Sequence, residues 1–244
     1  MVAPAEIRDE YNRLGQRQDI VHLKDFARWS YLSSDDWTEL CRRSADFIGV
    51  QDGDRLFEAG CGSGAFLAEV AAYRTVSLAG VDFAENLVAI AQSRLSGDFR
   101  VADITNLSFI DAGSYDKVLS HGVFLYLDSE DAARRAALEM VRITRPGGTV
   151  YIGIVNDPDR HADFDHPPSG SFLFTRAFWR DLATEEGLTL ELVDQERIFV
   201  NKFVYDFGDV HRGNVIVFSD PEGAAADRGI VGGFVHWLGE GIGV

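Results

Sequence analysis

The sequence predicts an α/β fold in which a mostly parallel sheet of seven strands carries helices on both faces. Short apolar runs alternate with amphipathic helical runs through the middle of the chain. A glycine-rich turn, FEAGCGSGAF at residues 57–66, overlaps the end of the first apolar run. Alternation of this kind is typical of parallel strands joined by helical crossovers. No helical run separates the last two apolar runs, so we expect these strands to pair antiparallel.

The expected elements follow one another at short intervals. We expect strands at residues 55–59, 76–83, 99–103, 115–123, 149–155, 188–198 and 214–219. We expect helices at residues 33–50, 65–73, 84–95, 129–144 and 175–187. Thr175 and the Ser/Asp run that begins at Ser33 are residue types that cap helix N-termini. The RPGG segment at 145–148 ends the fourth helix, because proline and glycine both interrupt helical structure.

The composition limits the classes of protein and of partner. The 244 residues are 46% hydrophobic, which is enough for one domain with a sizeable core. The formal net charge is −16, and nucleic-acid binding depends on lysine and arginine, so we expect no nucleic-acid partner. No stretch has the apolar length of a membrane span, and the segment 1–19 lacks the apolar core of a signal peptide. Two cysteines, Cys41 and Cys61, cannot build a disulfide scaffold, which favours a reduced, cytoplasmic setting.

Three regions of the chain differ in character. Residues 1–50 form an expected N-terminal helical cap, and residues 51–220 hold the glycine-rich turn and the expected sheet. Residues 221–244 form a tail that is rich in glycine and apolar side chains. Exposed apolar patches usually mark contacts, so the tail could dock on its own domain, cover the active site or join two copies in a homo-oligomer; disorder is the fourth alternative.

The glycine-rich turn fits a nucleotide-binding loop. Gly60, Gly62 and Ala65 satisfy the pattern G-x-G-x-x-G/A, and Asp82 follows Gly60 by 22 residues, where a ribose-binding acid is expected. Glycines let the backbone approach the ligand closely. Glu58 stands just before the glycines, where a carboxylate suits an amino-bearing ligand better than a pyrophosphate.

These features together resemble the class I S-adenosylmethionine-dependent methyltransferases. The resemblance covers roughly residues 50–220. It rests on FEAGCGSGAF, GVDFAENLVAIAQ, VADI, YDKVLSHGVFLYL and RITRPGGTVYI, in the family's order. A W…LS…W pattern ahead of the turn and the segment SHGVFLY are similar to one subgroup of these enzymes. The resemblance implies a Rossmann-like fold and S-adenosylmethionine as the cofactor.

The resemblance also implies a cofactor site along the ends of the first four strands. The implied residues are Glu58, Gly60, Cys61, Gly62, Gly64, Asp82, Phe83, Asp103, Ile104, Ser120 and His121. The first five would line the methionine and ribose part of the cofactor. Asp82 would take the ribose hydroxyls, Phe83 would flank the adenine, and Asp103 would accept from the adenine amino group beside Ile104. Ser120 and His121 would lie beneath the transferred methyl.

Methyl transfer to a hydroxyl or ammonium group also calls for a base. The methyl moves by in-line displacement, so the protein mainly aligns donor and acceptor. The acceptor must lose a proton, and histidine is the usual base near neutral pH. His121 is therefore the candidate base, with an expected pKa near 6.5. Its alternative role is to pack beneath the cofactor.

The acceptor site is expected beyond the same strand ends. Its candidate residues are Tyr11, Trp29, Tyr126, Asn156 and Arg212. The segment 157–166 contains two histidines and several aspartates, and could be an acceptor-site loop, a metal site or a solvated acidic loop. We favour the reading without a metal.

Three classes of function fit the sequence. The first is a methyltransferase that acts on an oxygen or nitrogen atom of a small molecule. The second is an NAD(P)-dependent oxidoreductase, because such enzymes share the glycine pattern. The third is a methyltransferase-like protein, such as a cyclase or a regulatory partner, that binds S-adenosylmethionine without transferring its methyl.

Overall fold

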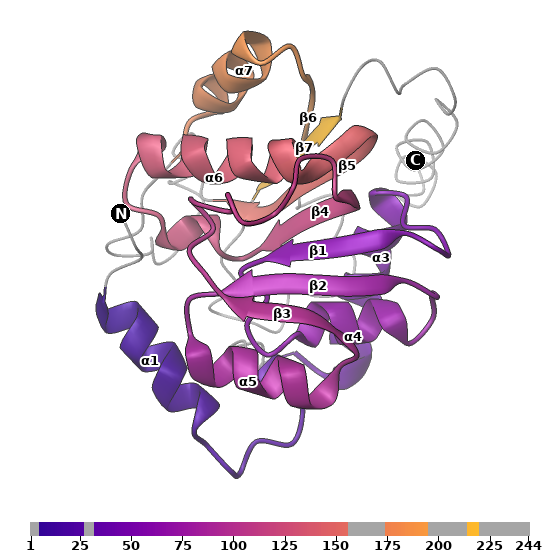
Figure 1. Cartoon of the computed structure of the whole chain (residues 1–244), viewed down its shortest axis with the longest axis vertical. Coiled ribbons are helices and arrows are strands. Elements are labelled where there is room, and N and C mark those ends of the chain that lie inside the picture. Colours follow the sequence, from indigo (N-terminus) through magenta and orange to yellow (C-terminus); the bar gives the residue numbers. More distant parts are fainter. Residues whose placement is uncertain (1–4, 27–31, 156–173, 195–213, 220–244) are drawn as a thin grey trace, which may run out of the picture.

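The computed structural model describes residues 5–26, 32–155, 174–194 and 214–219, and these residues surround one sheet (Figure 1). The sheet has seven strands in the order β3-β2-β1-β4-β5-β7-β6. The strands are β1 (Arg55–Ala59), β2 (Ser77–Asp82), β3 (Gly97–Val101), β4 (Tyr115–His121), β5 (Thr144–Val155), β6 (Thr189–Asp194) and β7 (Asn214–Ser219). The pairs among β1 to β5 are parallel, whereas β7 is antiparallel to both β5 and β6. The predicted α/β fold with an antiparallel last strand is confirmed.

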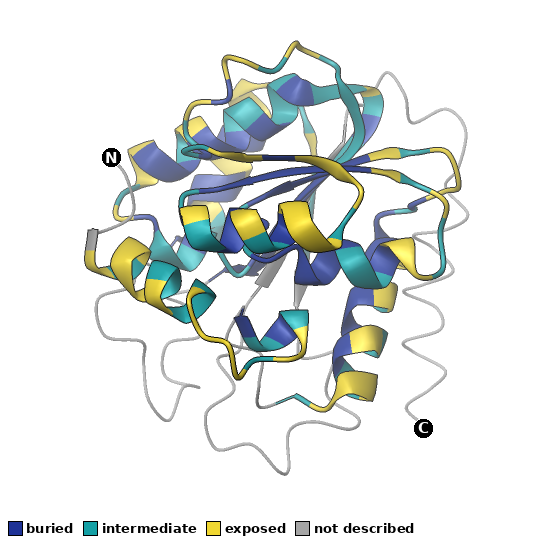
Figure 2. Ribbon diagram, turned by 60° about the horizontal axis from the view of Figure 1, so that its bottom comes forward, coloured by how far each residue is buried: buried dark blue, intermediate teal, exposed yellow. Residues whose placement is uncertain are grey.

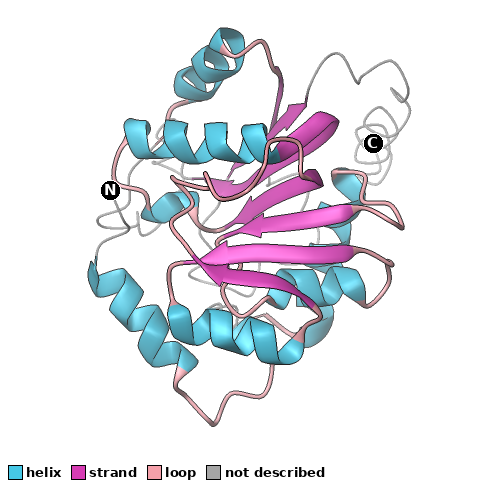
Figure 3. Ribbon diagram, in the orientation of Figure 1, coloured by secondary structure: helices cyan, strands magenta, loops and turns pink. Residues whose placement is uncertain are grey.

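Helices cover both faces of this sheet (Figure 3). They are α1 (Ala5–Gly15), α2 (Leu23–Phe26), α3 (Ser34–Phe47), α4 (Ala65–Ala71), α5 (Glu85–Arg94), the short 3₁₀ helix η1 (Phe124–Tyr126), α6 (Glu130–Ile143) and α7 (Arg176–Glu185). Helices α3, α4 and α5 pack against one face, and α6 and α7 pack against the other. Helix α1 lies outside this arrangement, alongside α5 (Figure 1).

Strand periodicity builds the two halves of the core. Successive side chains of a strand point to opposite faces, so neighbours in sequence enter different clusters. Leu56 and Leu78 pack with α3 and α4, whereas Phe57 and Ala79 pack with α6 and α7. The central strands are buried on both faces, as Figure 2 shows by their dark blue colour. Such strands read as continuous apolar runs in the sequence.

Hydroxyl side chains start three of the helices. The Ser33 Oγ accepts from the Asp36 N–H at 3.1 Å, and the Ser129 Oγ accepts from the Ala132 N–H at 3.2 Å. The Thr175 Oγ1 accepts from the Phe178 N–H at 3.1 Å. Each bond satisfies a backbone donor that has no partner within its helix. The predicted starts of α3, α6 and α7 are confirmed.

Several expected boundaries were wrong. The helix expected to end at residue 50 ends at Phe47, the strand expected to end at residue 123 ends at His121, and two further differences involve sequence motifs. Strand β3 begins at Gly97 and ends at Val101, so Asp103 lies two residues beyond the strand and does not end it. The RPGG segment lies inside β5, which begins at Thr144, and the pairing with β4 shifts register between Tyr115 and Lys117. Gly147 has a φ of 74° there, a conformation that favours glycine. The segment therefore forms an irregularity in the strand, not a turn that precedes it.

Candidate functional site

The glycine-rich turn joins β1 to α4 and is tied to the neighbouring strand. The N–H groups of Gly60 and Cys61 both donate to the Val81 carbonyl, at 2.7 and 2.8 Å. Gly60 has a φ of 85°, and a Cβ there would lie 2.4 Å from the Val123 Cγ2 atom. Position 60 therefore favours glycine for two reasons. Its backbone is left-handed, and the segment after β4 leaves no room for a Cβ atom.

Glu58 is buried at the end of β1 directly before the turn. Glu58 is only 4% exposed. Its Oε2 atom has no hydrogen-bond partner among the residues that the structure describes. Burial raises the pKa of Glu58 well above its ordinary value, and the neighbouring charge of Asp82 raises it further. A buried carboxyl group with an open oxygen atom is prepared to accept a hydrogen bond from a cationic ligand.

Asp82 ends β2 on the other side of the turn. Its Oδ2 accepts from the Gly62 N–H and its Oδ1 accepts from the Ala84 N–H, both at 2.8 Å. Burial raises the pKa of Asp82 to about 6, although these backbone hydrogen bonds oppose the shift. The side chain thus fixes the turn and the start of α5 together. Its expected contact with the ribose stays a prediction.

Asp103 and Ile104 lie in the segment between β3 and β4. The Asp103 Oδ1 atom accepts from the N–H and from the hydroxyl of Thr105, at 2.9 and 2.8 Å. Ile104 is buried in the core. The contact of Asp103 with the adenine stays a prediction.

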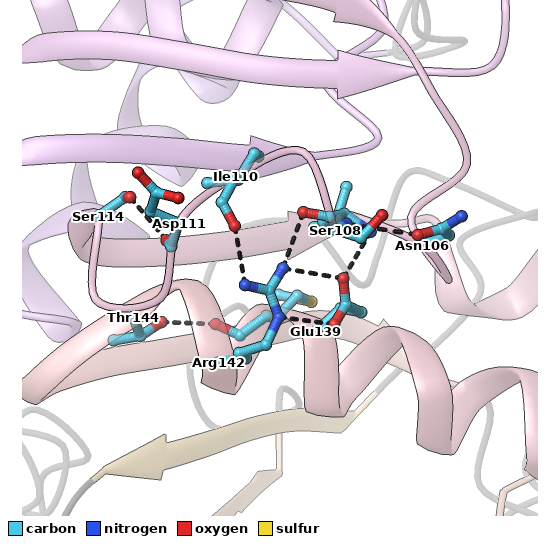
Figure 4. Close-up of polar contacts among 10 residues, drawn as sticks. Asn106, Ser108, Ile110, Asp111, Ser114, Glu139, Arg142 and Thr144 are labelled. Atoms are coloured by element: carbon cyan, nitrogen blue, oxygen red, sulfur yellow. Dashed lines mark hydrogen bonds and ion pairs between the residues drawn. The ribbon is translucent and has the colours of Figure 1, made fainter.

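A pair of charged side chains on α6 holds this segment in place (Figure 4). The Arg142 guanidinium donates to the carbonyls of Ile110 and Leu107, at 2.8 and 2.7 Å, and pairs with the Glu139 carboxylate. The same carboxylate accepts from the Leu107 N–H at 2.6 Å. The Arg142 hydrogen bond holds the pKa of Glu139 below its ordinary value. Residues 107–110 are thus anchored to α6.

Two expected cofactor residues direct their side chains into the protein. The Ser120 Oγ donates to the Ala59 carbonyl at 2.7 Å and is fully buried, so it joins the ends of β1 and β4. The Cys61 side chain packs in the core beneath the turn, where a Cβ on Gly80 would lie 2.8 Å from its Cβ. Burial raises the pKa of the Cys61 thiol. These side chains build the site, and Cys61 can meet a ligand only through its backbone.

His121 differs from the base that the sequence predicts. Its ring lies among the aromatic rings of Phe66, Trp37 and Tyr151, with centroids 5.6, 6.4 and 6.3 Å away. Burial lowers its pKa to about 4, so the expectation of a value near 6.5 was wrong. The imidazole is neutral at neutral pH and is a weak base. This environment supports the alternative of packing beneath the cofactor.

The structure brings Tyr11 and Tyr126 together across the strand ends. Their hydroxyl oxygens lie 2.9 Å apart, and their rings meet edge to face at 5.9 Å. Tyr11 also contacts the ring of Phe83, the expected adenine neighbour, at 6.3 Å. The sequence names both tyrosines as acceptor-site candidates, but it holds no signal for their mutual contact, because 115 residues separate them.

No pattern in the sequence predicts the contacts that hold the N-terminal cap, residues 1–50, against the glycine-rich turn. The Ser63 Oγ, inside the glycine-rich turn, donates to the Leu23 carbonyl at 2.9 Å. The Asn86 side chain donates to the Asn12 carbonyl at 3.0 Å, and the Asn86 N–H donates to the Asn12 Oδ1 at 3.2 Å. The cap therefore touches the elements that follow both β1 and β2.

Several predicted site residues and segments lie outside the described residues. They are Trp29, Asn156, Arg212, the segment 157–166 and the tail 221–244 with its oligomer contact. Within the described ranges, no three histidine, cysteine, aspartate or glutamate side chains are grouped as metal ligands would be. None of the helices described here combines the length and the apolar character needed to cross a bilayer.

The strand order and the site together define the Rossmann-like architecture of a class I methyltransferase, with acidic residues on both sides of a glycine-rich turn. Residues 57–152 match the model of a methyltransferase domain family. The match confirms a methyltransferase domain over these residues, and the resemblance to class I S-adenosylmethionine-dependent methyltransferases that the motifs predicted is confirmed for this domain.

Known relatives share part of this domain. A probable tRNA methyltransferase 9B of Bos taurus is 33% identical over 111 residues, which are 45% of this chain and 23% of that protein. A demethylmenaquinone methyltransferase of Renibacterium salmoninarum is 29% identical over 156 residues, 63% of this chain and 55% of the relative. The chain thus spans about a quarter and about half of the lengths of these relatives. A putative methyltransferase in complex with the Trm112 activator of Haloferax volcanii has a similar fold, with a TM-score of 0.65 at 19% identity over 87% of this chain and 98% of that one.

A second family model, that of signal peptidases of family S26, matches residues 171–231. The described residues in this range form α7, β6 and β7. Strands β6 and β7 complete the methyltransferase sheet by pairing next to β5. We therefore assign the described part of this range to the methyltransferase fold.

Proposed function

We propose that the protein transfers a methyl group from S-adenosylmethionine to an oxygen or nitrogen atom of a small molecule. The observation that carries this proposal is the buried Glu58 carboxyl, whose open oxygen lies at the head of the glycine-rich turn. S-adenosylmethionine carries an amino group on its methionine part and no phosphate. Its ammonium group complements Glu58, and the glycines allow the close approach that a nucleoside needs.

The electrostatics of the turn disfavour a dinucleotide. Glu58 and Asp82 are both buried beside the turn, and burial together with the charge of Asp82 already raises the pKa of Glu58. A pyrophosphate in the same place would add like charges in a poorly solvated region, which is unfavourable. A cation instead relieves the repulsion between the two carboxyl groups. The site therefore favours S-adenosylmethionine over NAD(P).

The chain supplies alignment and shielding for the reaction. S-adenosylmethionine, when bound, supplies an electrophilic methyl group on a positively charged sulfur. The turn and Glu58 would hold its methionine part, and Asp82 would keep the turn in shape. The rings of Phe66, Trp37 and Tyr151 around His121 keep water from the end of β4. Alignment of this kind accounts for much of the rate of such a displacement.

The acceptor class follows from charge and from the relatives. The net charge of −16 disfavours the phosphate backbone of a nucleic acid, so we propose a small-molecule acceptor in a cytoplasmic setting. The Renibacterium relative is a demethylmenaquinone methyltransferase, which supports a non-nucleic-acid acceptor such as a quinone. The bovine relative is a probable tRNA methyltransferase, which supports a tRNA acceptor as the competing class.

A filter-binding titration with total tRNA separates the small-molecule acceptor from the tRNA acceptor. Micromolar tRNA binding would contradict our proposal.

The test of the cofactor uses Glu58→Gln, which keeps the shape of the side chain and removes its charge. We expect calorimetry to show about 10- to 100-fold weaker S-adenosylmethionine binding, because a hydrogen bond to a charged group is worth roughly 1.5–3 kcal/mol. Adenosine lacks the amino group, so its affinity should change much less. Glu69→Gln on α4 is the matched control. Equal weakening of both ligands would show that Glu58 only orders the turn, and binding of NAD(P) without S-adenosylmethionine would overturn the proposed function.

A further inference from the structure

The two tyrosines bridge the crevice where this fold binds its ligands. In an open α/β sheet, ligands bind at the carboxyl ends of the strands, at the point where the strand order reverses. In this sheet the order reverses between β1 and β4, and β2 lies on the other side of β1. Phe83 directly follows β2, and Tyr126 ends the η1 helix that follows β4. A contact that joins these two positions must cross the end of β1.

Tyr11 makes this connection. Its ring meets Phe83 on one side and Tyr126 on the other, and its hydroxyl lies 2.9 Å from the Tyr126 hydroxyl. The Tyr126 end is fixed, because Val123 at the start of the η1 segment packs against Gly60 of the glycine-rich turn. The Tyr11 end is fixed through Asn12, its neighbour on α1, which is bonded to Asn86 of α5. The bridge is thus anchored at both ends to elements of the cofactor site.

We propose that Tyr126, oriented by its hydrogen bond to Tyr11, places its hydroxyl oxygen beside the methyl that is transferred. The inference rests on the proposed function, because it assumes that S-adenosylmethionine lies over the end of β1. Phe83 would then mark the adenine side of the bridge, and Tyr126 the methyl side. This makes Tyr126 a polar group that contacts the reacting atoms beyond the end of β4, whereas the His121 ring is buried among aromatic side chains.

The chemistry of a paired phenol suits this position. The two hydroxyls share one hydrogen bond, which holds the Tyr126 oxygen in a defined orientation. A phenol oxygen has a further lone pair, and it can accept from an ammonium group strongly or from a polarised methyl C–H weakly. A hydroxyl oxygen held in a hydrogen bond is a weak nucleophile, so it does not compete with the acceptor for the electrophilic methyl. The arrangement orients the methyl without reacting with it.

The experiment compares three ligands that differ at the methyl-bearing centre, which is a sulfonium in S-adenosylmethionine, an uncharged thioether in S-adenosylhomocysteine and a carbon atom in sinefungin. S-adenosylhomocysteine has no group there, S-adenosylmethionine has the methyl, and sinefungin has an amino group in its place. Calorimetry gives their affinities for the parent protein, Tyr126→Phe and Tyr11→Phe. Tyr115→Phe is the matched control, because Tyr115 is the first residue of β4 and lies at the amino end of that strand, away from the carboxyl ends where Tyr126 lies. Phenylalanine keeps the ring packing, and thermal unfolding followed by circular dichroism checks the fold of each variant.

We expect Tyr126→Phe to weaken sinefungin by about 10- to 100-fold, S-adenosylmethionine by a few-fold and S-adenosylhomocysteine hardly at all. Tyr11→Phe should give the same order with smaller losses, and Tyr115→Phe should give none. Equal losses for the three ligands would show that the bridge only orders the cap, and unchanged affinities would show that Tyr126 faces elsewhere; either result overturns the inference. A parent protein that binds none of the three contradicts the proposed function itself.

Discussion

At the residue scale, His121 carries a cost of burial that depends on pH. Its ring lies among three aromatic rings, and burial lowers its pKa to about 4 from an ordinary value of 6.5. The unfolded chain therefore binds a proton at a higher pH than the folded protein does. The contribution of His121 to the free energy of unfolding is fully present above pH 6.5. It falls by about 3 kcal/mol as the pH is lowered toward 4.

This linkage predicts the behaviour of His121→Phe, which keeps a ring in the aromatic enclosure. Urea unfolding of the parent and of the variant between pH 7.5 and pH 4 should show the parent losing about 3 kcal/mol more than the variant. Taking the difference between the two proteins removes the contributions of Glu58 and Asp82, whose raised pKa values act in the opposite direction. Parallel pH profiles for the two proteins would show that the His121 pKa is near its ordinary value after all.

At the scale of elements, the glycine-rich turn and η1 depend on each other through Gly60. An alanine there would have a φ of 85° and a Cβ 2.4 Å from the Val123 Cγ2 atom and 3.0 Å from its Cγ1 atom. Both methyl groups of Val123 are close, so rotation of this stiff β-branched side chain cannot relieve the contact. The turn and η1 must move apart instead.

We predict that Gly60→Ala destabilises the protein more than Gly53→Ala does. Gly53 has a φ of 93° with no atom near an added Cβ, so its alanine variant reports only the cost of the left-handed backbone, roughly 1–2 kcal/mol. The clash at Gly60 should add about 1–3 kcal/mol in urea unfolding. The Gly60 variant alone should also lose S-adenosylmethionine affinity. Similar losses in both variants would mean that Val123 yields without cost.

At the scale of the whole molecule, the N-terminal cap belongs to the cofactor site. Helix α1 contacts α5, Phe83 and Tyr126, and α2 is bonded to the glycine-rich turn through Leu23 and Ser63. These contacts follow three neighbouring strands, β1, β2 and β4. A ligand that binds between the cap and the strand ends should therefore stabilise the cap together with the turn.

Hydrogen exchange measured by mass spectrometry tests this coupling. S-adenosylmethionine at about 100 times its dissociation constant should slow the exchange of α1 and of residues 57–66 by up to about 100-fold. Peptides from α7 should change little, because α7 packs on the opposite face of the sheet from α4 and α5, and its neighbouring strand is β6. Protection of the turn without protection of α1 would show that the cap does not close on the cofactor.

The sequence by itself determined the order of strands and helices, the glycine-rich turn and the helix starts at Ser33, Ser129 and Thr175. These features arise from apolar periodicity and from hydrogen bonds between residues three apart, so a short stretch of sequence contains them. Glu58 and Asp82 could be named for the same reason, because Glu58 is the last but one residue of β1 and Asp82 is the last residue of β2.

Only the tertiary structure decided what the other site residues do. Trp37, Phe66 and Tyr151 enclose His121 from three separate elements, and their combined burial sets a pKa that no local pattern contains. Tyr11 and Tyr126 meet across 115 residues of chain. Such contacts exist because the strand order brings distant segments together at the carboxyl ends of the strands. The burial and the hydrogen bonds of each side chain there depend on all of its neighbours in space.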